Sequence, residues 1–254
     1  MLTVGSLFSG IGGFDLGFER AGFEIKWQVE IDPFCRQVLA KHWPNVRRYE
    51  DVRSVGAELE YVDVLCGGFP CQDISSAGKR VGIEGPRSSL WREMRRLVGE
   101  LRPRYVVVEN VADLLIRGIG DVLGDLAGLG YDAEWTTLSA CRFGAPHTRE
   151  RVFIVAYPDR RERGASRPHQ AQTAPANVSL DGAGDKARLS AWFAVEPALD
   201  RMVHGFSGLV DEIRPYGNAI LPQESEWIAE RIKEAEGIES GVERTVVRAV
   251  KDGF

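Results

Sequence analysis

One cysteine, Cys71, has a setting that suits a nucleophile. It follows the apolar run 61–66 and the turn residues Phe69 and Pro70, so the sequence predicts a strand end and a rigid turn that carries the thiol outward. A thiol at a strand edge, near the N-terminus of a following helix, can be activated and can reach a substrate. The alternative is an inert cysteine in a hydrophobic core, which is the common setting of a lone cysteine.

Glycines follow the first apolar segment, 2–8. Gly10, Gly12 and Gly13 stand at a predicted turn from strand to helix, where bare backbone can approach a ligand closely. The dinucleotide fingerprint is not met, because Asp15 occupies the place of its third glycine. The pattern therefore indicates a cofactor site but disfavours a nicotinamide cofactor. A tight structural turn is the alternative.

Two acids follow the next segments of the chain. Glu30 ends the apolar segment 24–29, about 20 residues past the glycines, where a carboxylate can accept hydrogen bonds from ribose hydroxyls. Asp51, with Val52 beside it, stands where a third strand would end and can accept a hydrogen bond from the exocyclic amine of an adenine. Glycines with two acids at successive strand ends predict a cofactor site more strongly than the glycine turn alone.

The charge of the chain is unevenly distributed. The formal net charge of −5 argues against a polyanionic partner, because phosphate binding depends on lysine and arginine. The segment 142–167 nevertheless holds seven arginines against three acids, which is the local excess that a groove for nucleic acid needs. A solvated, arginine-rich loop is the alternative.

Length and composition limit the class of protein. The 254 residues can form one α/β domain with a modest appendage. The four cysteines lack the spacings of a zinc site or a disulfide framework, so we expect no metal and a reducing, cytoplasmic setting. We also expect neither export nor a membrane partner, because the sequence has no signal-peptide pattern and no long apolar span.

Strands and helices alternate along the chain. Strands are predicted at 2–8, 24–29, 62–66, 105–109, 133–138 and 152–156. Helical spacing of apolar residues is found at 17–21, 34–42, 89–101, 119–129 and 223–235. This alternation predicts an α/β fold with a mostly parallel sheet flanked by helices.

The composition divides the chain into four parts. Residues 1–157 carry the alternating elements and are expected to form the catalytic and cofactor-binding domain. From 158 to about 191 the chain is polar, with almost no large apolar residue before Leu180, so 158–205 is expected to be a loop-rich region without a core of its own. Residues 206–236 are expected to return to the first domain, and 237–254 to form a peripheral tail.

Five motifs resemble, in order and spacing, the signature blocks of DNA (cytosine-5) methyltransferases. They are the glycine turn 8–13, the Gly-Gly-Phe-Pro-Cys-Gln-Asp-Ile-Ser run 67–75, Glu-Asn-Val at 109–111, Arg-Glu-Arg at 149–151 and Gly-Asn-Ala at 217–219. The resemblance covers Leu2 to about Arg231, except the polar segment from 158 to 191. It implies a Rossmann-like fold dependent on S-adenosylmethionine, with a small, loop-rich target-recognition region, as in compact phage or prokaryotic members.

The resemblance also implies a mechanism. Cys71 would add as a thiolate to C6 of a cytosine flipped out of duplex DNA, which makes C5 able to attack the methyl group of S-adenosylmethionine. Glu109 would stabilise the charge that develops at N3 as a neutral acid, because burial at a strand end raises a carboxyl pKa. Arg149 and Arg151 would hold the base O2 and the thiolate region by charge-assisted hydrogen bonds.

The remaining site residues are assigned by position in the same blocks. The cofactor contacts implied are Phe8, Gly10, Gly12, Gly13, Glu30, Ile31, Asp51, Val52, Pro70, Leu90, Asn218 and Ala219, with Trp27 and Ile31 expected to sandwich the adenine. The DNA contacts implied are Ser75, Lys79, Arg80, Arg160, Arg161, Arg163 and Arg167. The last four would supply phosphate contacts, which give affinity without sequence information.

The sequence departs from the family pattern in two places. His147 stands where the arginine block usually begins with glutamine, and the interval 152–216 is short for a target-recognition region. A monomer is expected, with a restriction endonuclease as a possible partner, in a host cytoplasm if a phage encodes the chain. Two alternatives keep the fold: a transfer-RNA cytosine-5 methyltransferase, and a non-catalytic DNA-binding relative.

Overall fold

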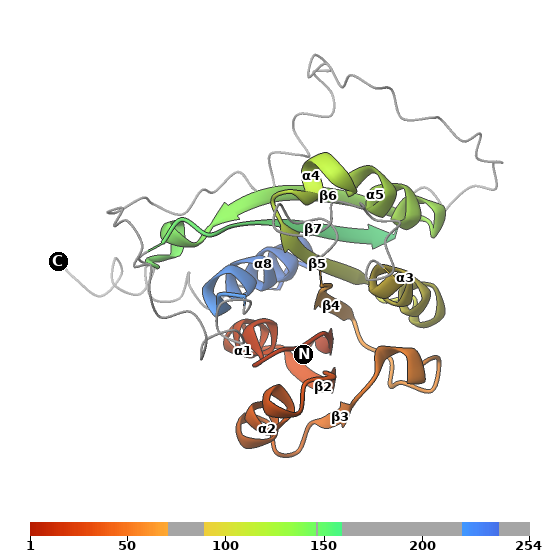
Figure 1. Ribbon diagram of the computed structural model, residues 1–254, viewed down its shortest axis with the longest axis vertical. Helices are drawn as coiled ribbons and strands as arrows, with labels where there is room; N and C mark the ends of the chain where they lie inside the picture. The colour runs from red at the N-terminus through yellow and green to blue at the C-terminus, as the bar shows by residue number, and fades with distance from the viewer. Residues whose placement is uncertain (71–88, 146, 159–219, 239–254) are drawn as a thin grey trace, which may run out of the picture.

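The computed structural model describes residues 1–70, 89–145, 147–158 and 220–238. These residues form a seven-stranded sheet in the order β3-β2-β1-β4-β5-β7-β6 (Figure 1). The strands are β1 (Thr3–Leu7), β2 (Glu24–Val29), β3 (Arg47–Tyr49), β4 (Val64–Gly68), β5 (Tyr105–Val111), β6 (Tyr131–Ser139) and β7 (Glu150–Pro158). The first five strands of the sheet order are parallel, which confirms the predicted α/β fold with a mostly parallel sheet.

The last two strands run the other way. β7 lies between β5 and β6 and is antiparallel to both, which alternation of elements alone does not predict. The link from β6 to β7, residues 140–149, is too short for the crossover that a parallel pair requires, and its described residues include the 3-10 helix η3 (Ala140–Phe143). The short strand β3 was not among the strands assigned from apolar periodicity, because three residues give no periodicity to detect, although a third strand end was expected near Asp51.

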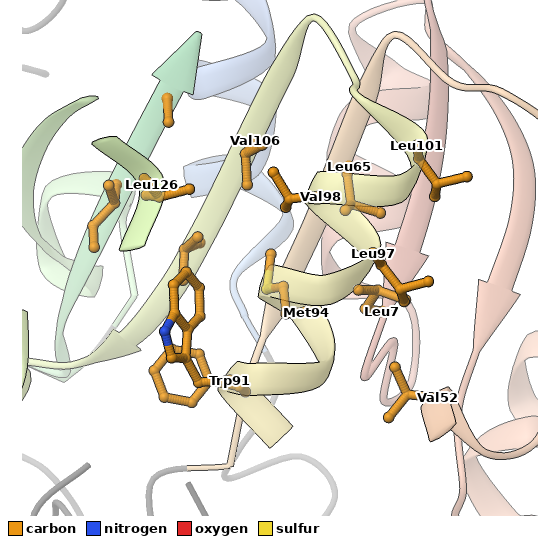
Figure 2. Close-up of a cluster of buried hydrophobic side chains, with 14 of the residues drawn as sticks. Leu7, Val52, Leu65, Trp91, Met94, Leu97, Val98, Leu101, Val106 and Leu126 are labelled. Carbon is orange, nitrogen blue, oxygen red and sulfur yellow. The ribbon is translucent and has the colours of Figure 1, made fainter. Parts of the chain in front are cut away.

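Helices cover both faces of the sheet. One face is covered by α3 (Ser89–Leu101), α4 (Leu114–Arg117) and α5 (Ile119–Gly128), whose buried side chains form one apolar cluster with the strands. Figure 2 shows this cluster, with Met94, Leu97 and Val98 of α3 pointing toward Leu65 and Val106 of the sheet. The apolar residues of α3 recur at helical spacing on one side of a helix that is otherwise polar, which explains why sequence patterns predicted this helix with its observed bounds.

The other face is covered by α1 (Gly13–Arg20) and α8 (Pro222–Ala235), which lie side by side although about 200 residues separate them. Phe14 and Phe18 of α1 pack with Ile228 and Ile232 of α8 in a second apolar cluster. The two helices approach closely because α1 has a glycine at the contact. A Cβ atom on Gly17 would lie 2.0 Å from Ser225 Oγ and 2.3 Å from Pro222 O.

The order of the strands defines where a ligand can bind. From β1 the sheet extends through β2 to one side and through β4 to the other, so the chain reverses direction across the sheet between β1 and β4. In open α/β sheets the ligand crevice lies outside the carboxyl ends of the strands at such a point. The glycine turn after β1 and the Phe-Pro turn after β4 both lie at this edge.

Substitution by alanine should change stability in opposite directions at two glycines inside helices. Gly17→Ala forces a methyl group against α8, so the free energy of unfolding should fall by about 1–3 kcal/mol. Gly124 of α5 has no atom within 4 Å of the equivalent position, so Gly124→Ala should raise it by up to about 1 kcal/mol through helix propensity. Urea unfolding of both variants measures the difference. A Gly17→Ala protein as stable as the parent would contradict the close packing of α1 on α8.

Candidate active site

The turn after β1 has an unusual backbone. Phe8, Gly10 and Gly12 all have positive φ values of 52°, 55° and 90°, a left-handed conformation that is uncommon for a residue with a bulky side chain such as Phe8. Gly12 begins α1 as its N-cap residue, and its backbone N–H donates to Ser9 O at 2.9 Å. At Gly13 a Cβ atom would lie 2.3 Å from Ile220 O, so glycine is required where the segment before α8 passes.

Glu30 fixes this turn to the end of β2. Its Oε2 accepts a hydrogen bond from Gly10 N at 2.7 Å, and its Oε1 accepts one from Asp32 N at 2.8 Å. Asp32 in turn caps α2 (Pro33–His42), because its Oδ1 accepts from Phe34 N and Cys35 N. The predicted acid at this position is therefore held in a defined orientation by backbone donors on both sides.

A cavity of about 590 Å³ lies over the turn and brings together most of the predicted site residues. Its walls include twelve of them: Phe8, Gly10, Gly13, Glu30, Ile31, Asp51, Val52, Pro70, Leu90, Glu109, Arg149 and Arg151. Asp51 caps the 3-10 helix η1 (Val52–Ser54), with its Oδ1 accepting from Arg53 N at 2.9 Å. That backbone N–H lowers the pKa of Asp51, which keeps the carboxylate ionised as an acceptor.

Two predicted positions lie elsewhere. The prediction that Trp27 sandwiches an adenine is wrong, because its side chain is 1% exposed, packs over Gly5 in the core and donates from Nε1 to Glu60 O. Gly12 lines a neighbouring cavity of about 560 Å³, next to Trp43 and His147. Ile31, the other half of the predicted sandwich, is 58% exposed and lies at the wall of the larger cavity.

Glu109 is buried at the end of β5 between two arginines. Its Oε1 lies 3.0 Å from Arg151 Nε and 4.0 Å from Arg149 Nη2. Burial raises the pKa of Glu109, and the charges of Arg151 and then Arg149 oppose that rise. The pKa of Glu109 is therefore raised, as expected, but its carboxyl also forms an ion pair with Arg151. Glu109 holds a proton only where the cost of burying its negative charge exceeds the stabilisation of that charge by the two guanidinium groups.

Neighbouring residues fix the end of β4 against Glu109. A Cβ atom on Gly68 would lie 2.5 Å from Glu109 Oε2, so a larger residue there would displace the carboxyl from its observed position. Asn110 Nδ2 donates to Phe69 O at 3.1 Å, and the Phe69 ring packs on Trp91 with a centroid distance of 5.5 Å. These contacts support the predicted rigid turn up to Pro70.

A buried polar network beneath the glycine turn was not predicted. Asp15 has no solvent exposure and accepts from Gln28 Nε2 at 2.8 Å, while Ser6 Oγ lies 3.1 Å from its other oxygen and 2.9 Å from Ser9 Oγ. Burial raises the pKa of Asp15 to about 6, against the hydrogen bonds from Gln28 and Ser6. The available signal was polar Ser6 and Gln28 next to apolar residues near the ends of their strands, since buried polar residues occur in partnered sets.

Several predicted residues lie outside the described part of the chain. They are the nucleophile Cys71, the cofactor contacts Asn218 and Ala219, and the DNA contacts Ser75, Lys79, Arg80, Arg160, Arg161, Arg163 and Arg167. Most of the predicted recognition region, all but Pro158, and the tail after Ile238 lie outside it too. Among the described residues no cluster of three His, Cys, Asp or Glu side chains could hold a metal ion, and no helix has the length and apolarity to cross a membrane.

Comparison with known proteins gives a consistent set of matches. A family model described as C-5 cytosine-specific DNA methylase matches residues 2–182. The Type II methyltransferase M2.BsuMI of Bacillus subtilis is 37% identical over 163 residues, which are 61% of this chain and 42% of that protein. M.NgoFVII of Neisseria gonorrhoeae is 35% identical over 157 residues, which are 59% of this chain and 42% of that protein. The chain spans less than half the length of these two relatives.

Solved structures show the same fold. A prophage-encoded Escherichia coli protein, named as a DNA modification methyltransferase, matches with a TM-score of 0.64 and 21% identity over 93% of this chain and 100% of that chain. The Spodoptera frugiperda DNMT2 structure matches with a TM-score of 0.53 and 17% identity over 82% of this chain and 56% of that chain. The chain therefore has the α/β methyltransferase fold.

Asp15 predicts a pH dependence of stability. Its folded-state pKa of about 6 lies above the unfolded value of 3.8, so the unfolded chain releases the proton first and stability is lost as pH rises toward and through 6. Asp15→Asn removes this titration. The stability of the variant relative to the parent should increase by about 1–2 kcal/mol between pH 5 and pH 8. Urea unfolding at both pH values measures it, and a difference independent of pH would contradict the buried titration.

Proposed function

The chain belongs to the C-5 cytosine-specific DNA methylase family, and on this basis we propose that it transfers a methyl group from S-adenosylmethionine to C5 of a cytosine flipped out of duplex DNA, through a covalent bond between Cys71 and C6. The observation that carries the proposal is the shared cavity. One cavity is lined by Gly10 of the glycine turn, by the acid Glu109 and by Pro70, the residue directly before Cys71.

The residues of the cavity fit S-adenosylmethionine. Each Glu30 oxygen accepts one backbone N–H, and a carboxylate has about four acceptor sites, so capacity remains for two ribose hydroxyls. Gly10 has no atom within 4 Å of a Cβ position, so a ligand can lie directly against the backbone there. Asp51 would accept from the adenine amine and Ile31 would contact the ring. Bound in this way, S-adenosylmethionine supplies an electrophilic methyl group on a sulfonium.

The protein residues supply the rest of the chemistry. The Cys71 thiolate forms a bond to C6, and the electron pair displaced from the C5–C6 double bond is delocalised toward N3. Glu109, protonated, donates a hydrogen bond at N3 and stabilises that charge, which is the role its burial permits. Once C5 carries the methyl group, its proton passes to water, the electron pair of that C–H bond restores the C5–C6 double bond, and Cys71 leaves C6 as a thiolate. Arg149 and Arg151 lie next to Glu109 and would orient its carboxyl. They would also donate hydrogen bonds to O2 of the base.

We propose that DNA binding depends on residues flanking this cavity. Ser75, Lys79 and Arg80 follow the nucleophile closely in sequence, so they are assigned to the flipped base and its backbone. Arg160, Arg161, Arg163 and Arg167 are assigned to phosphates. Arg149 and Arg151 are not available for phosphates, because their side chains are only 16% and 17% exposed and lie near Glu109.

Substitution of the nucleophile tests the proposed chemistry. Cys71→Ala should abolish methyl transfer to duplex DNA, because it removes the thiolate that forms the bond to C6, while the Kd for S-adenosylmethionine should change less than about threefold. Cys141→Ala is the matched control and should retain transfer, since Cys141 is remote in sequence from the proposed motif and partly buried. Labelled cofactor with duplex DNA, and separately with transfer RNA, measures both variants. Full turnover by Cys71→Ala would exclude the mechanism. Methylation of transfer RNA but not of duplex DNA by the parent protein would show that RNA is the substrate.

Substitution of Glu30 tests the cofactor site. Glu30→Ala leaves Gly10 N and Asp32 N without their acceptor and removes the proposed ribose partner, so the Kd for S-adenosylmethionine should rise by at least about tenfold. Glu50→Ala is the control, because Glu50 lines the same cavity but its side chain is 70% exposed and its ion pair with Arg36 is long at 3.4 Å. Its Kd should change less than about threefold. Isothermal titration calorimetry measures both, and equal effects would contradict the assignment.

A further inference from the structure

Ser9 connects a buried polar network to the wall of the larger cavity. It lies between Phe8 and Gly10, which both have a left-handed backbone, and it lines the cavity that is assigned to the cofactor. Its backbone N–H donates to Val29 O at 3.1 Å, and its carbonyl oxygen accepts from Gly12 N at 2.9 Å. A left-handed residue with a bulky side chain persists only where neighbouring contacts hold it, so the bonds that Ser9 makes hold the turn in this shape.

The side chain of Ser9 continues inward to Asp15. Ser9 Oγ lies 2.9 Å from Ser6 Oγ, which lies 3.1 Å from Asp15 Oδ2. The other carboxyl oxygen, Asp15 Oδ1, accepts from Gln28 Nε2 at 2.8 Å. None of these four side chains belongs to a residue that is more than 7% exposed, so the groups depend on one another for hydrogen bonds.

The contacts of this network need one proton more than the two serines supply. Ser9 Oγ lies 3.1 Å from Ser6 O and 3.4 Å from Val29 O, and carbonyl oxygens only accept, so the Ser9 hydroxyl donates there. The Ser6 hydroxyl has one proton, which can bond Ser9 Oγ or Asp15 Oδ2 but not both. All three contacts are hydrogen bonds only when Asp15 is protonated at Oδ2 and donates to Ser6.

Ionisation of Asp15 breaks this chain of hydrogen bonds. A carboxylate only accepts, so it takes the proton of Ser6, and the Ser9 hydroxyl then donates either to Ser6 Oγ or to the carbonyl oxygens. One contact next to the turn is lost in both cases. Burial raises the pKa of Asp15 to about 6, while the hydrogen bonds from Gln28 and Ser6 lower it, so the chain is complete at pH 5 and interrupted at pH 8.

Titratable groups on the strands around Asp15 do not take over its role. The five residues of β1, Thr3–Leu7, include none. On β4 the titratable group is the buried thiol of Cys66, which stays neutral because burial and then the charge of Asp15 raise its pKa well above the usual value. On β2, Glu24 and Lys26 form an ion pair with each other at 2.7 Å.

The charges on the neighbouring helices are exposed or without influence on Asp15. Among the influences on the pKa of Asp15, the charge of Glu19, which is exposed on α1, is the smallest. Arg20 of α1 lies 3.8 Å from Glu226 of α8, and both side chains are more than a third exposed, so water screens this pair. The charged side chains of α8, none of which is among the influences on Asp15, are Glu224, Glu226, Glu230, Arg231, Lys233 and Glu234.

We propose that Asp15 is a positioning residue for the cofactor: its proton completes the hydrogen-bond chain through Ser6 and Ser9 that holds the glycine turn in the shape that binds S-adenosylmethionine. This inference rests on the proposed function, in which that turn lies against the cofactor. The proton and the cofactor then favour each other's binding, because both stabilise the same shape of the turn. The contribution of Asp15 to affinity is therefore complete at pH 5 and is lost as the carboxyl ionises.

Two substitutions separate the proton from the rest of the network. Asp15→Asn imitates the protonated acid at every pH, because the new carbonyl oxygen can accept from Gln28 and the new amide group can donate to Ser6. Ser9→Ala interrupts the chain at the turn itself. Thr3→Val is the matched control, because it removes a hydrogen-bonded hydroxyl from the same strand, at the end away from the cavity.

The experiment is isothermal titration calorimetry with S-adenosylmethionine at pH 5 and pH 8. The groups of the cofactor titrate equally in every variant, so the ratio of two Kd values at one pH isolates the effect of the substitution. Asp15→Asn should match the parent within about 1.5-fold at pH 5 and bind at least about threefold more tightly than the parent at pH 8. Thr3→Val should match the parent at both pH values.

A double substitution tests whether the effect passes through Ser9. Ser9→Ala should bind about threefold or more weakly than the parent at pH 5, because the turn has lost a hydrogen bond. Adding Asp15→Asn to Ser9→Ala should then change the Kd by less than about 1.5-fold at either pH.

A purely structural role of Asp15 gives a different outcome. Asp15→Asn would then change the Kd by the same factor at pH 5 and pH 8, or leave it equal to that of the parent at both. Either result would overturn the inference, and so would a tighter binding at pH 8 that persists in the Ser9→Ala background.

A second measurement needs no cofactor. In the ¹⁵N-labelled parent protein alone, the backbone amide signals of Ser9 and Gly10 should shift in one step centred at the pKa of Asp15, about 6, and Asp15→Asn should remove that step. Signals that do not shift in the parent, or that shift equally in both proteins, would overturn the inference even if S-adenosylmethionine binds. Absence of binding by the parent, with the titration of the turn intact, would instead refute the proposed function and leave the control of the turn by Asp15 established.

Discussion

The direction of β7 is the constraint on which the site depends. Because β7 is antiparallel to β5, the carboxyl end of β5 lies beside the amino end of β7, with Val111 opposite Arg151 and Glu109 opposite Phe153. Glu109 and Arg151 are therefore diagonal neighbours on one face, at a separation that their side chains span to form the 3.0 Å contact. A parallel β7 would place the arginines that precede its apolar run at the opposite edge of the sheet, away from the cavity.

This arrangement also governs protonation at the site. A carboxyl buried without cations would take up a proton and lose its orientation, whereas a fully matched ion pair would keep the carboxylate ionised. Glu109 lies between these limits, because burial raises its pKa while Arg151 and Arg149 oppose the rise. The absence of a side chain at Gly68 is what allows the carboxyl to come this close to β4, so a backbone feature of one strand sets the electrostatics of the next.

Local sequence patterns predicted the parts of this site but not all of their arrangement. The glycine turn, Glu30 and Glu109 were found because each follows an apolar run, and strand ends of a mostly parallel sheet meet at one edge. The antiparallel pairing of β7 was not found, because direction depends on a partner remote in sequence. The misplacement of Trp27 has a similar cause: its register partner on β1 is Gly5, whose missing side chain makes room for the indole in the core.

The contact between α1 and α8 explains how a late segment of the chain can complete a site that is built mainly by its first 158 residues. Ser225 Oγ donates to Gly13 O at 3.0 Å, and Ile220 lines both cavities, so the position of α8 is fixed by α1 and the glycine turn themselves. The entropy of closing the connection from β7 to α8 grows only with the logarithm of its length. A segment between these two elements can therefore change in length at little cost to the site.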